Sequence, residues 1–303
     1  MTARDRLVDG GYAAGWRVVR ALPAPVARRL FDRGADVAAR RGGASVDQLR
    51  RNLARVRPAA SPDELDELDE LVRAALRSYA RYWREAFRLP TMDHDALRAV
   101  VGPRISGLEH VEASLAAGRG TILALPHSGN WDVAGVWLVG RCGGFTTVAE
   151  RLRPEALYRR FVAYRESLGF EIVPLTGGAE PVGDVLTRRL RDNRVVCLVA
   201  DRDIGGAGVK VDFFGEPAKL PVGPAKLAER TGAALLPVGL WFTEDGWGFR
   251  VHPPVVETSV RAAVQATADA FAADLAEHPE DWHMLQRFWL ADLPTRAPRQ
   301  RAT

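Results

Sequence analysis

Cysteine is nearly absent from this 303-residue chain, which contains only Cys142 and Cys197. Both lie within apolar segments and lack the spacing of a disulfide framework or a zinc site, so we expect reduced, buried thiols in a cytosolic compartment. The chain also lacks any uninterrupted apolar run of about 18 residues, which argues against a membrane-spanning helix. Its first residues show no compact apolar core with a cleavage site, and we expect no secretory signal.

Several catalytic signatures are missing as well. There is no G-x-S-x-G elbow, which weakens the case for a serine hydrolase. The glycine cluster at 205–208 matches neither a dinucleotide-binding loop nor a Walker loop, and we interpret it as a flexible turn. Because no metal-ligand spacing of His and Cys is present, we expect neither a metal nor a bound cofactor.

Acidic residues are scarce at the amino-terminal end. Residues 1–60 carry 13 Arg against 5 Asp, a net charge of +8, whereas the whole chain carries +4. Trp16, Val26 and Leu30 alternate with these arginines, and amphipathic basic helices of this kind suit an anionic lipid surface. The alternative is that the helices pack on the protein and expose their arginines to water. We interpret residues 1–58 as a membrane-contact region, and we expect no nucleic-acid partner because no recognition motif accompanies the charge.

Residues 59–293 have the pattern of one α/β domain. Ser61-Pro62-Asp63-Glu64 is typical of a helix start and precedes apolar positions at helical spacing, which predicts a helix over about 62–88. Short apolar runs then alternate with helical stretches, which predicts a mostly parallel central sheet covered by helices on both faces. We expect strands at 121–125, 145–149, 171–175, 195–200, 234–240 and 249–256, a last helix at about 259–277, and a flexible tail at 294–303.

The most informative segment is His127-Ser128-Gly129-Asn130-Trp131-Asp132, which follows the apolar run 121–126. A strand that ends in His-x4-Asp places an imidazole and a carboxylate at the edge of a sheet where α/β proteins hold their chemistry. A neutral imidazole accepts a proton from a hydroxyl, and a nearby carboxylate fixes its tautomer. The pair indicates activation of an alcohol as a nucleophile.

A second carboxylate competes for this orienting role. Asp201 comes directly after the apolar run 195–200, where a carboxylate needs a partner, and His127 and Arg165 are the available ones. Either Asp132 or Asp201 therefore orients the imidazole, and the sequence leaves the choice open.

Taken together and in order, the motifs of residues 60–290 resemble the late lipid A acyltransferase family, the lauroyl and myristoyl transferases. The resemblance is greatest to its actinobacterial branch, the phosphatidylinositol mannoside acyltransferases. The segments that carry it are Tyr82-Trp83-Arg84-Glu85-Ala86-Phe87, Pro126 to Asp132, Glu150, Arg165 with Gly169, Ala200-Asp201-Arg202-Asp203, Phe213 to Ala218, and His278-Pro279-Glu280-Asp281-Trp282.

The resemblance implies transfer of an acyl chain, often palmitoyl, from acyl-CoA to a mannose hydroxyl of a glycolipid. The enzyme would then be a peripheral protein on the cytoplasmic face of the cell membrane, in contact with its inner leaflet. His127 would be the general base, and backbone amides near the following helix would stabilise the oxyanion. Glu150 and Arg165 match positions that line the site. We assign further substrate contacts to Tyr82, Trp83, Asn130, Phe213, Phe214 and Lys219.

Several alternatives remain at this stage. The aromatic residues Tyr82, Trp83, Phe213 and Phe214 suit core packing as well as a substrate wall, and Lys219 suits a solvated surface as well as a phosphate contact. A lysophospholipid or glycerol-phosphate acyltransferase would share His-x4-Asp. An acyl-CoA thioesterase and a non-catalytic lipid-binding protein are the other candidates.

Overall fold

The computed structural model describes residues 3–58 and 61–293, and the expected flexible tail at 294–303 lies outside this range. A seven-stranded sheet with the order β1-β9-β8-β2-β5-β3-β4 forms its centre. All neighbouring strands are parallel except β8 and β9, which form an antiparallel pair. The prediction of a mostly parallel α/β sheet is confirmed. The strands are β1 Ile105–Ser106, β2 Thr121–Leu125, β3 Phe145–Ala149, β4 Phe170–Pro174, β5 Val195–Val199, β8 Ala234–Thr243 and β9 Gly246–Val251.

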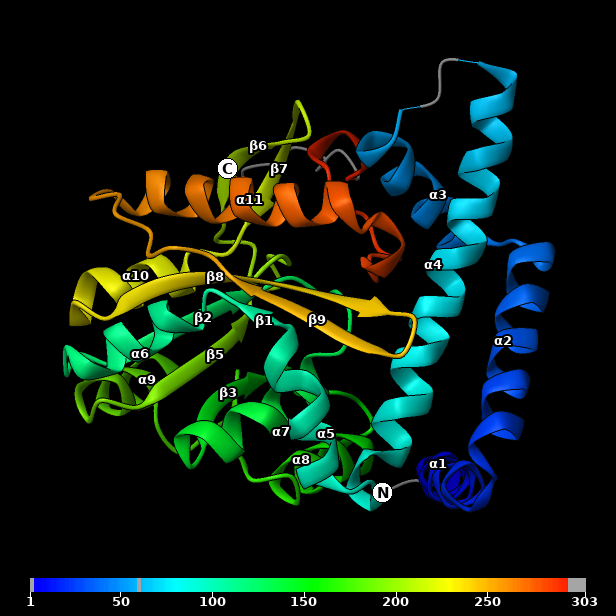
Figure 1. Ribbon diagram of the computed structural model, residues 1–303, viewed down its shortest axis with the longest axis horizontal. Coiled ribbons are helices and arrows are strands. Elements are labelled where there is room, and N and C mark those ends of the chain that lie inside the picture. Colours follow the sequence, from blue (N-terminus) through cyan, green and yellow to red (C-terminus); the bar gives the residue numbers. More distant parts are fainter. Residues whose placement is uncertain (1–2, 59–60, 294–303) are drawn as a thin grey trace, which may run out of the picture.

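Helices cover both faces of this sheet (Figure 1). One face packs against α9 Val182–Arg191, α10 Gly223–Thr231 and α11 Val260–Glu277. The other packs against α5 His94–Val101, α6 Leu108–Ala116, α7 Trp131–Cys142 and α8 Glu155–Glu166. The sheet has a hydrophobic core on each face, the first beneath α9, α10 and α11 and the second beneath α5, α6, α7 and α8. In strand β2, Ile122 and Ala124 point into the first core while Leu123 and Leu125 point into the second, so both faces must be covered by helices.

The long helix α4 Pro62–Arg88 spans the side of the molecule and matches its predicted bounds. The Ser61 side chain caps its amino end by accepting a hydrogen bond from the Glu64 amide at 3.3 Å. Helix α4 lies between the sheet and the outer helix α2 Ala24–Arg41 (Figure 1). It therefore connects the basic amino-terminal region to the central domain.

Only part of the amino-terminal region faces outward. On α1 Ala3–Ala21, Trp16 is buried against Phe87, Phe161 and Tyr164, so this tryptophan packs on the domain. On α2, by contrast, Val26, Leu30 and Val37 are exposed. Helix α3 Ala44–Val56 is also tied to the domain, because the Asn52 side chain donates hydrogen bonds to the Met284 and Gln286 carbonyls. No helix within the described residues is long and apolar enough to cross a membrane.

Several strands differ from the sequence-based expectation, and the two-residue strand β1 was not predicted. A hairpin of β6 Val209–Phe213 and β7 Glu216–Leu220 was not predicted, because its short strands carry a Pro and several charged residues. The last strand, expected at 249–256, instead occupies Gly246–Val251. It ends early because Pro253 and Pro254 lack the amide hydrogens that a strand ladder needs.

Candidate active site

His127 lies just beyond β2, in a turn that depends on Gly129. The backbone of Gly129 has φ +52°, and a Cβ atom there would lie 2.8 Å from the Leu240 carbonyl carbon. Only glycine combines this left-handed conformation with so close an approach to β8. The turn places His127 above the sheet and lets α7 begin four residues later, at Trp131.

The His127 imidazole pairs with Asp201, which follows β5. His127 Nδ1 lies 2.5 Å from Asp201 Oδ1, and the His127 amide donates to Asp201 Oδ2 at 2.9 Å. Strands β2 and β5 are parallel neighbours, so their carboxyl ends bring the two residues together. This contact fixes the proton on Nδ1 and leaves Nε2 as the basic nitrogen.

Asp201 is held as an anion in a closed environment. Its side chain is 1% exposed, and Trp282 Nε1 donates to its Oδ2 at 3.1 Å. Burial alone would raise the pKa of Asp201, but the His127 charge and the hydrogen bonds from His127 and Trp282 lower it below its ordinary value. The carboxylate can therefore stabilise an imidazolium at His127.

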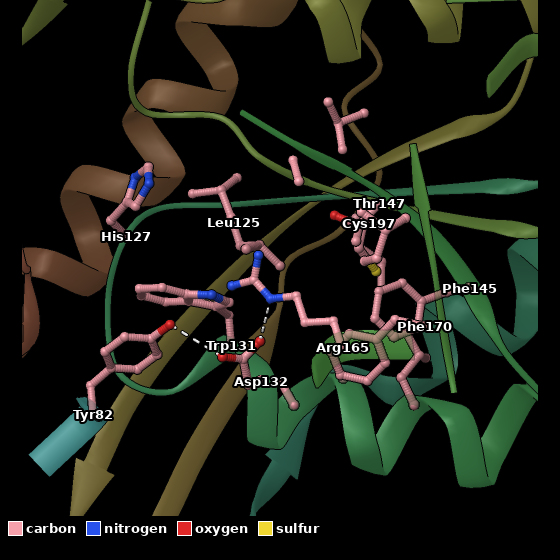
Figure 2. Close-up of a pocket in the computed structure, with 18 of the residues that line it drawn as sticks. Tyr82, Leu125, His127, Trp131, Asp132, Phe145, Thr147, Arg165, Phe170 and Cys197 are labelled. Atoms are coloured by element: carbon pink, nitrogen blue, oxygen red, sulfur yellow. Dashed lines mark hydrogen bonds and ion pairs between the residues drawn. The ribbon is translucent and has the colours of Figure 1, made fainter. Parts of the chain in front are cut away.

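Asp132, the other candidate partner of the imidazole, bonds elsewhere. Arg165 Nε donates to Asp132 Oδ1 at 2.9 Å, and the Tyr82 hydroxyl donates to Oδ2 at 3.2 Å (Figure 2). Burial would lower the pKa of Arg165, but the Asp132 charge raises it above its ordinary value. Of the two acids named in the sequence analysis, Asp201 therefore contacts His127, whereas Asp132 forms an ion pair with Arg165.

Asn130 acts on the backbone rather than facing the cavity. Its Oδ1 caps α7 by accepting from the Val133 amide at 3.1 Å, and its Nδ2 donates to the buried Glu85 at 2.8 Å. Glu85 also accepts a hydrogen bond from Trp247 Nε1 at 2.8 Å. Both polar groups of Asn130 are therefore engaged, which fixes the start of α7 beside His127.

Most backbone amides between His127 and α7 already donate hydrogen bonds within the protein. The His127 amide donates to Asp201, the Ser128 amide to the Pro126 carbonyl, and the Gly129 amide to the Asp281 carbonyl. The Asn130 amide and the amides of the first turn of α7 remain as candidate oxyanion donors. The expected oxyanion site is narrowed to these groups.

A cavity of about 600 Å³ opens beside His127, within the second core. Figure 2 shows His127 and Trp131 at one end and Phe145, Phe170 and Cys197 at the other. All seven strands of the sheet contribute residues to its wall, among them Leu125, Thr147, Ile172, Cys197 and Val238. This lining is predominantly apolar, and the volume lies in the range of small-molecule sites.

The remaining predicted site residues divide into two groups. Tyr82, Trp83, Glu150 and Arg165 line the cavity, and Glu150 is exposed at its rim. Phe213, Phe214 and Lys219 belong to the β6–β7 hairpin instead and are not among the lining residues. Phe213 is a core residue because it packs against Trp282, Phe288 and Trp289 beneath α11.

His283, which the sequence analysis did not assign to the site, lines the same cavity. Its amide donates to the His127 carbonyl at 2.8 Å. Ser78 Oγ lies 2.5 Å from Asp281 Oδ1 and 3.0 Å from His283 Nε2, so one hydroxyl links the two side chains. Among the described residues, His283 Nδ1 has no hydrogen-bond partner. The feature of the sequence that could have indicated its place in the site is the pair of polar residues, Asp281 and His283, on either side of Trp282.

Burial shifts both ends of this Asp281–Ser78–His283 chain toward the neutral forms. Burial raises the pKa of Asp281 to about 7, although hydrogen bonds from Ser78 and the Phe242 amide oppose the rise. Burial and the nearby His127 lower the pKa of His283 to about 3. Both side chains are therefore uncharged in weakly acidic solution.

Asp281→Asn tests this state, because asparagine resembles the protonated carboxyl and does not titrate. Folded Asp281 keeps its proton up to about pH 7, whereas the unfolded chain releases it near 3.8, so its stabilising contribution is lost as pH rises through this window. The unfolding free energy of the wild type should fall relative to Asp281→Asn by about 1.4 kcal/mol per pH unit there. Urea unfolding of both proteins across the window measures the difference. His283 is present in both proteins, so its contribution to the pH dependence cancels from the difference. A difference in unfolding free energy that does not change with pH would contradict a protonated Asp281.

Within residues 3–58 and 61–293, no three His, Cys, Asp or Glu side chains are grouped so that they could hold a metal ion.

Comparison with known proteins gives consistent matches over nearly the whole chain. The model of the family described as bacterial lipid A biosynthesis acyltransferase matches residues 6–291. A phosphatidylinositol mannoside acyltransferase of Mycolicibacterium smegmatis is 59% identical over 292 residues, which cover 95% of this chain and 93% of that protein. A protein of the same name from Mycobacterium tuberculosis (strain CDC 1551 / Oshkosh) is 60% identical over 290 residues, covering 94% of this chain and 89% of that protein.

Proposed function

The chain is an acyltransferase that belongs to the bacterial lipid A biosynthesis acyltransferase family, and from this we propose that it acylates a mannose hydroxyl of phosphatidylinositol mannosides. The acyl donor in this proposal is acyl-CoA, with palmitoyl as the chain, and the reaction requires no further cofactor. The acceptor is inferred from the name that the two mycobacterial relatives share.

The observation that carries the proposal is the His127–Asp201 pair at one end of a long apolar cavity. His127 Nε2 accepts the proton of the mannose hydroxyl as that oxygen attacks the thioester carbonyl carbon. The carbon–sulfur bond then breaks, and the CoA thiolate leaves and takes up the proton from the imidazolium. Asp201 stabilises the transient imidazolium, and the first turn of α7 supports the oxyanion.

The cavity suits the acyl chain. Each methylene moved from water into such an apolar space contributes about 0.8 kcal/mol, so a long chain supplies much of the binding free energy. We place the chain between the sheet and helices α6, α7 and α8, with the thioester near His127. Arg165, Tyr82 and Asp132 form the polar wall at that end and orient the acceptor sugar.

The test is release of CoA from palmitoyl-CoA by the purified protein, with and without phosphatidylinositol mannoside in detergent. Release that requires the acceptor, together with a product heavier by one acyl group, supports the proposal. Release without acceptor indicates a thioesterase. Transfer to a lysophospholipid in place of the mannoside would redirect the assignment to that class of acyltransferase, and no release by folded protein would favour a lipid-binding role.

We further propose that α1 and α2 hold the enzyme on the cytoplasmic membrane surface as a peripheral protein. On α2, Val26, Leu30 and Val37 lie on one face at helical spacing, and the exposed Arg29 and Arg33 flank them. Apolar side chains with neighbouring arginines suit an anionic lipid interface. Helix α2 itself lies on the outer side of the molecule, separated from the sheet by α4 (Figure 1).

Leu30→Asp should weaken binding to phosphatidylglycerol vesicles by about tenfold or more, because an exposed leucine loses its burial in lipid. Co-sedimentation at low and high salt measures the binding and its electrostatic part. Val256→Asp is the matched control, since Val256 is 86% exposed in the loop between β9 and α11, on the side away from α2 (Figure 1). Equal vesicle binding by the two variants would argue against α2 as the membrane face.

A further inference from the structure

A second cavity, of about 280 Å³, lies at the opposite end of the apolar cavity from His127. Its wall includes the residues that precede or begin two central strands, Gly144 before β3 and Arg194 and Val195 at β5. Its rim is polar, because Arg141 and Glu112 form an ion pair there. The mechanism proposed above does not use this space.

The two cavities follow one another along β5. Cys197 and Val199 line the first cavity, and Val195 lines the second. Alternate residues of a strand point to the same face, so these three side chains form one row. The row covers four residue steps of about 3.3 Å each. The second cavity thus continues the direction in which an acyl chain would run away from His127.

Leu108 and Val111 separate the two spaces, because both residues line both cavities. They are three positions apart on α6 and therefore share one face of that helix. Val111 is 3% exposed, so its side chain fills the partition. The amino end of α6 is fixed in place, since a Cβ atom on Gly107 would overlap the Val251 carbonyl oxygen of β9. The partition is therefore part of a rigid contact with the sheet.

We propose that Leu108 and Val111 form the floor of the acyl site and set the longest acyl chain that the enzyme accepts. This inference rests on the proposed function, because it requires the acyl chain to occupy the first cavity. Shortening either side chain would join the two spaces and admit further methylenes. Each additional buried methylene should then raise kcat/KM up to about fourfold.

The test is a series of saturated acyl-CoA donors from lauroyl to lignoceroyl, with kcat/KM measured for wild type, Leu108→Ala and Val111→Ala. We expect the maximum for both variants to move to donors at least two carbons longer than for wild type. Leu115→Ala is the matched control, because Leu115 lies on the same helix and lines only the second cavity. Its maximum should stay where the wild type has it.

The outcomes separate this inference from the function on which it rests. If wild type transfers no acyl group from any donor, the proposed function fails. If wild type is active and both variants keep its chain-length maximum, the floor assignment is overturned while the function stands. Val111→Ala removes only two methyl carbons from the core and is the smaller change. It tests the assignment if thermal unfolding shows that Leu108→Ala does not fold. A shift in Leu115→Ala equal to that in Val111→Ala would also overturn the assignment, because the effect would then not depend on the partition.

Discussion

His127→Ala should reduce kcat for acyl transfer by about 10²- to 10⁴-fold, the usual contribution of a general base. The expectation follows from the contact with Asp201, which assigns the proton to Nδ1 and leaves Nε2 to accept the proton of the attacking hydroxyl. Alanine retains the backbone bond from residue 127 to Asp201, so the turn and the cavity should persist. The apparent KM for the acyl donor should therefore change little, since the apolar cavity is intact.

His110→Ala is the control for this variant. His110 is a partly buried histidine on α6 that does not line the cavity, and its removal should leave kcat within about twofold. Single-turnover measurements with both proteins would separate chemistry from product release. Retention of more than about a tenth of the wild-type rate by His127→Ala would remove the general-base assignment.

Asp201→Asn should also lower kcat strongly, by roughly 10²- to 10⁴-fold, through the tautomer of His127. Asparagine would keep its oxygen toward the His127 amide and Trp282 Nε1, which both donate to Asp201 Oδ2. Its amide group would then donate to His127 Nδ1 and place the ring proton on Nε2. The imidazole would lose the basic nitrogen at the substrate and the carboxylate that stabilises its charged form.

Asp132→Asn is the matched comparison, since it makes the same change in the other acid of the motif. It leaves Arg165 without an anionic partner, and breaking a buried pair of this kind costs about 3 kcal/mol or more. We therefore expect a loss of unfolding free energy and a smaller loss of kcat, with the shape of the pH–rate profile retained. In Asp201→Asn, by contrast, the shape of the pH–rate profile should be lost. A larger catalytic defect in Asp132→Asn than in Asp201→Asn would reverse the assignment of the orienting acid.

Much of the fold could be predicted because the strands are buried on both faces. Runs such as 121–125 and 145–149 match observed strands residue for residue, since short segments rich in apolar and β-branched residues between helical stretches are typical of a parallel sheet. The hairpin at 209–220 was missed because its mixed polar pattern resembles a loop. That hairpin also explains the position of Phe213, whose aromatic side chain completes the core instead of a substrate wall.

The site was only partly visible in the sequence. His127 and the two candidate acids could be named from their places at strand ends, but the choice between Asp201 and Asp132 depends on which strands are neighbours. His283 was not identified as a cavity residue for the same reason, since the sequence does not reveal that its segment pairs with the turn after β2. Long-range pairing of this kind leaves no periodic signal in the chain.

The pairing of residues 281–284 with the turn at His127 also has a consequence for how the protein folds. Trp282 reaches Asp201 across 81 positions of the chain, and His127 reaches Asp201 across 74. Closing loops of this length costs chain entropy that local contacts do not, so contacts of this kind slow folding. A chain in which residues 281–284 are not docked also leaves Asp201 without its indole partner and the turn at His127 without its pairing segment. Formation of the complete site is therefore coupled to docking of the carboxyl-terminal segment.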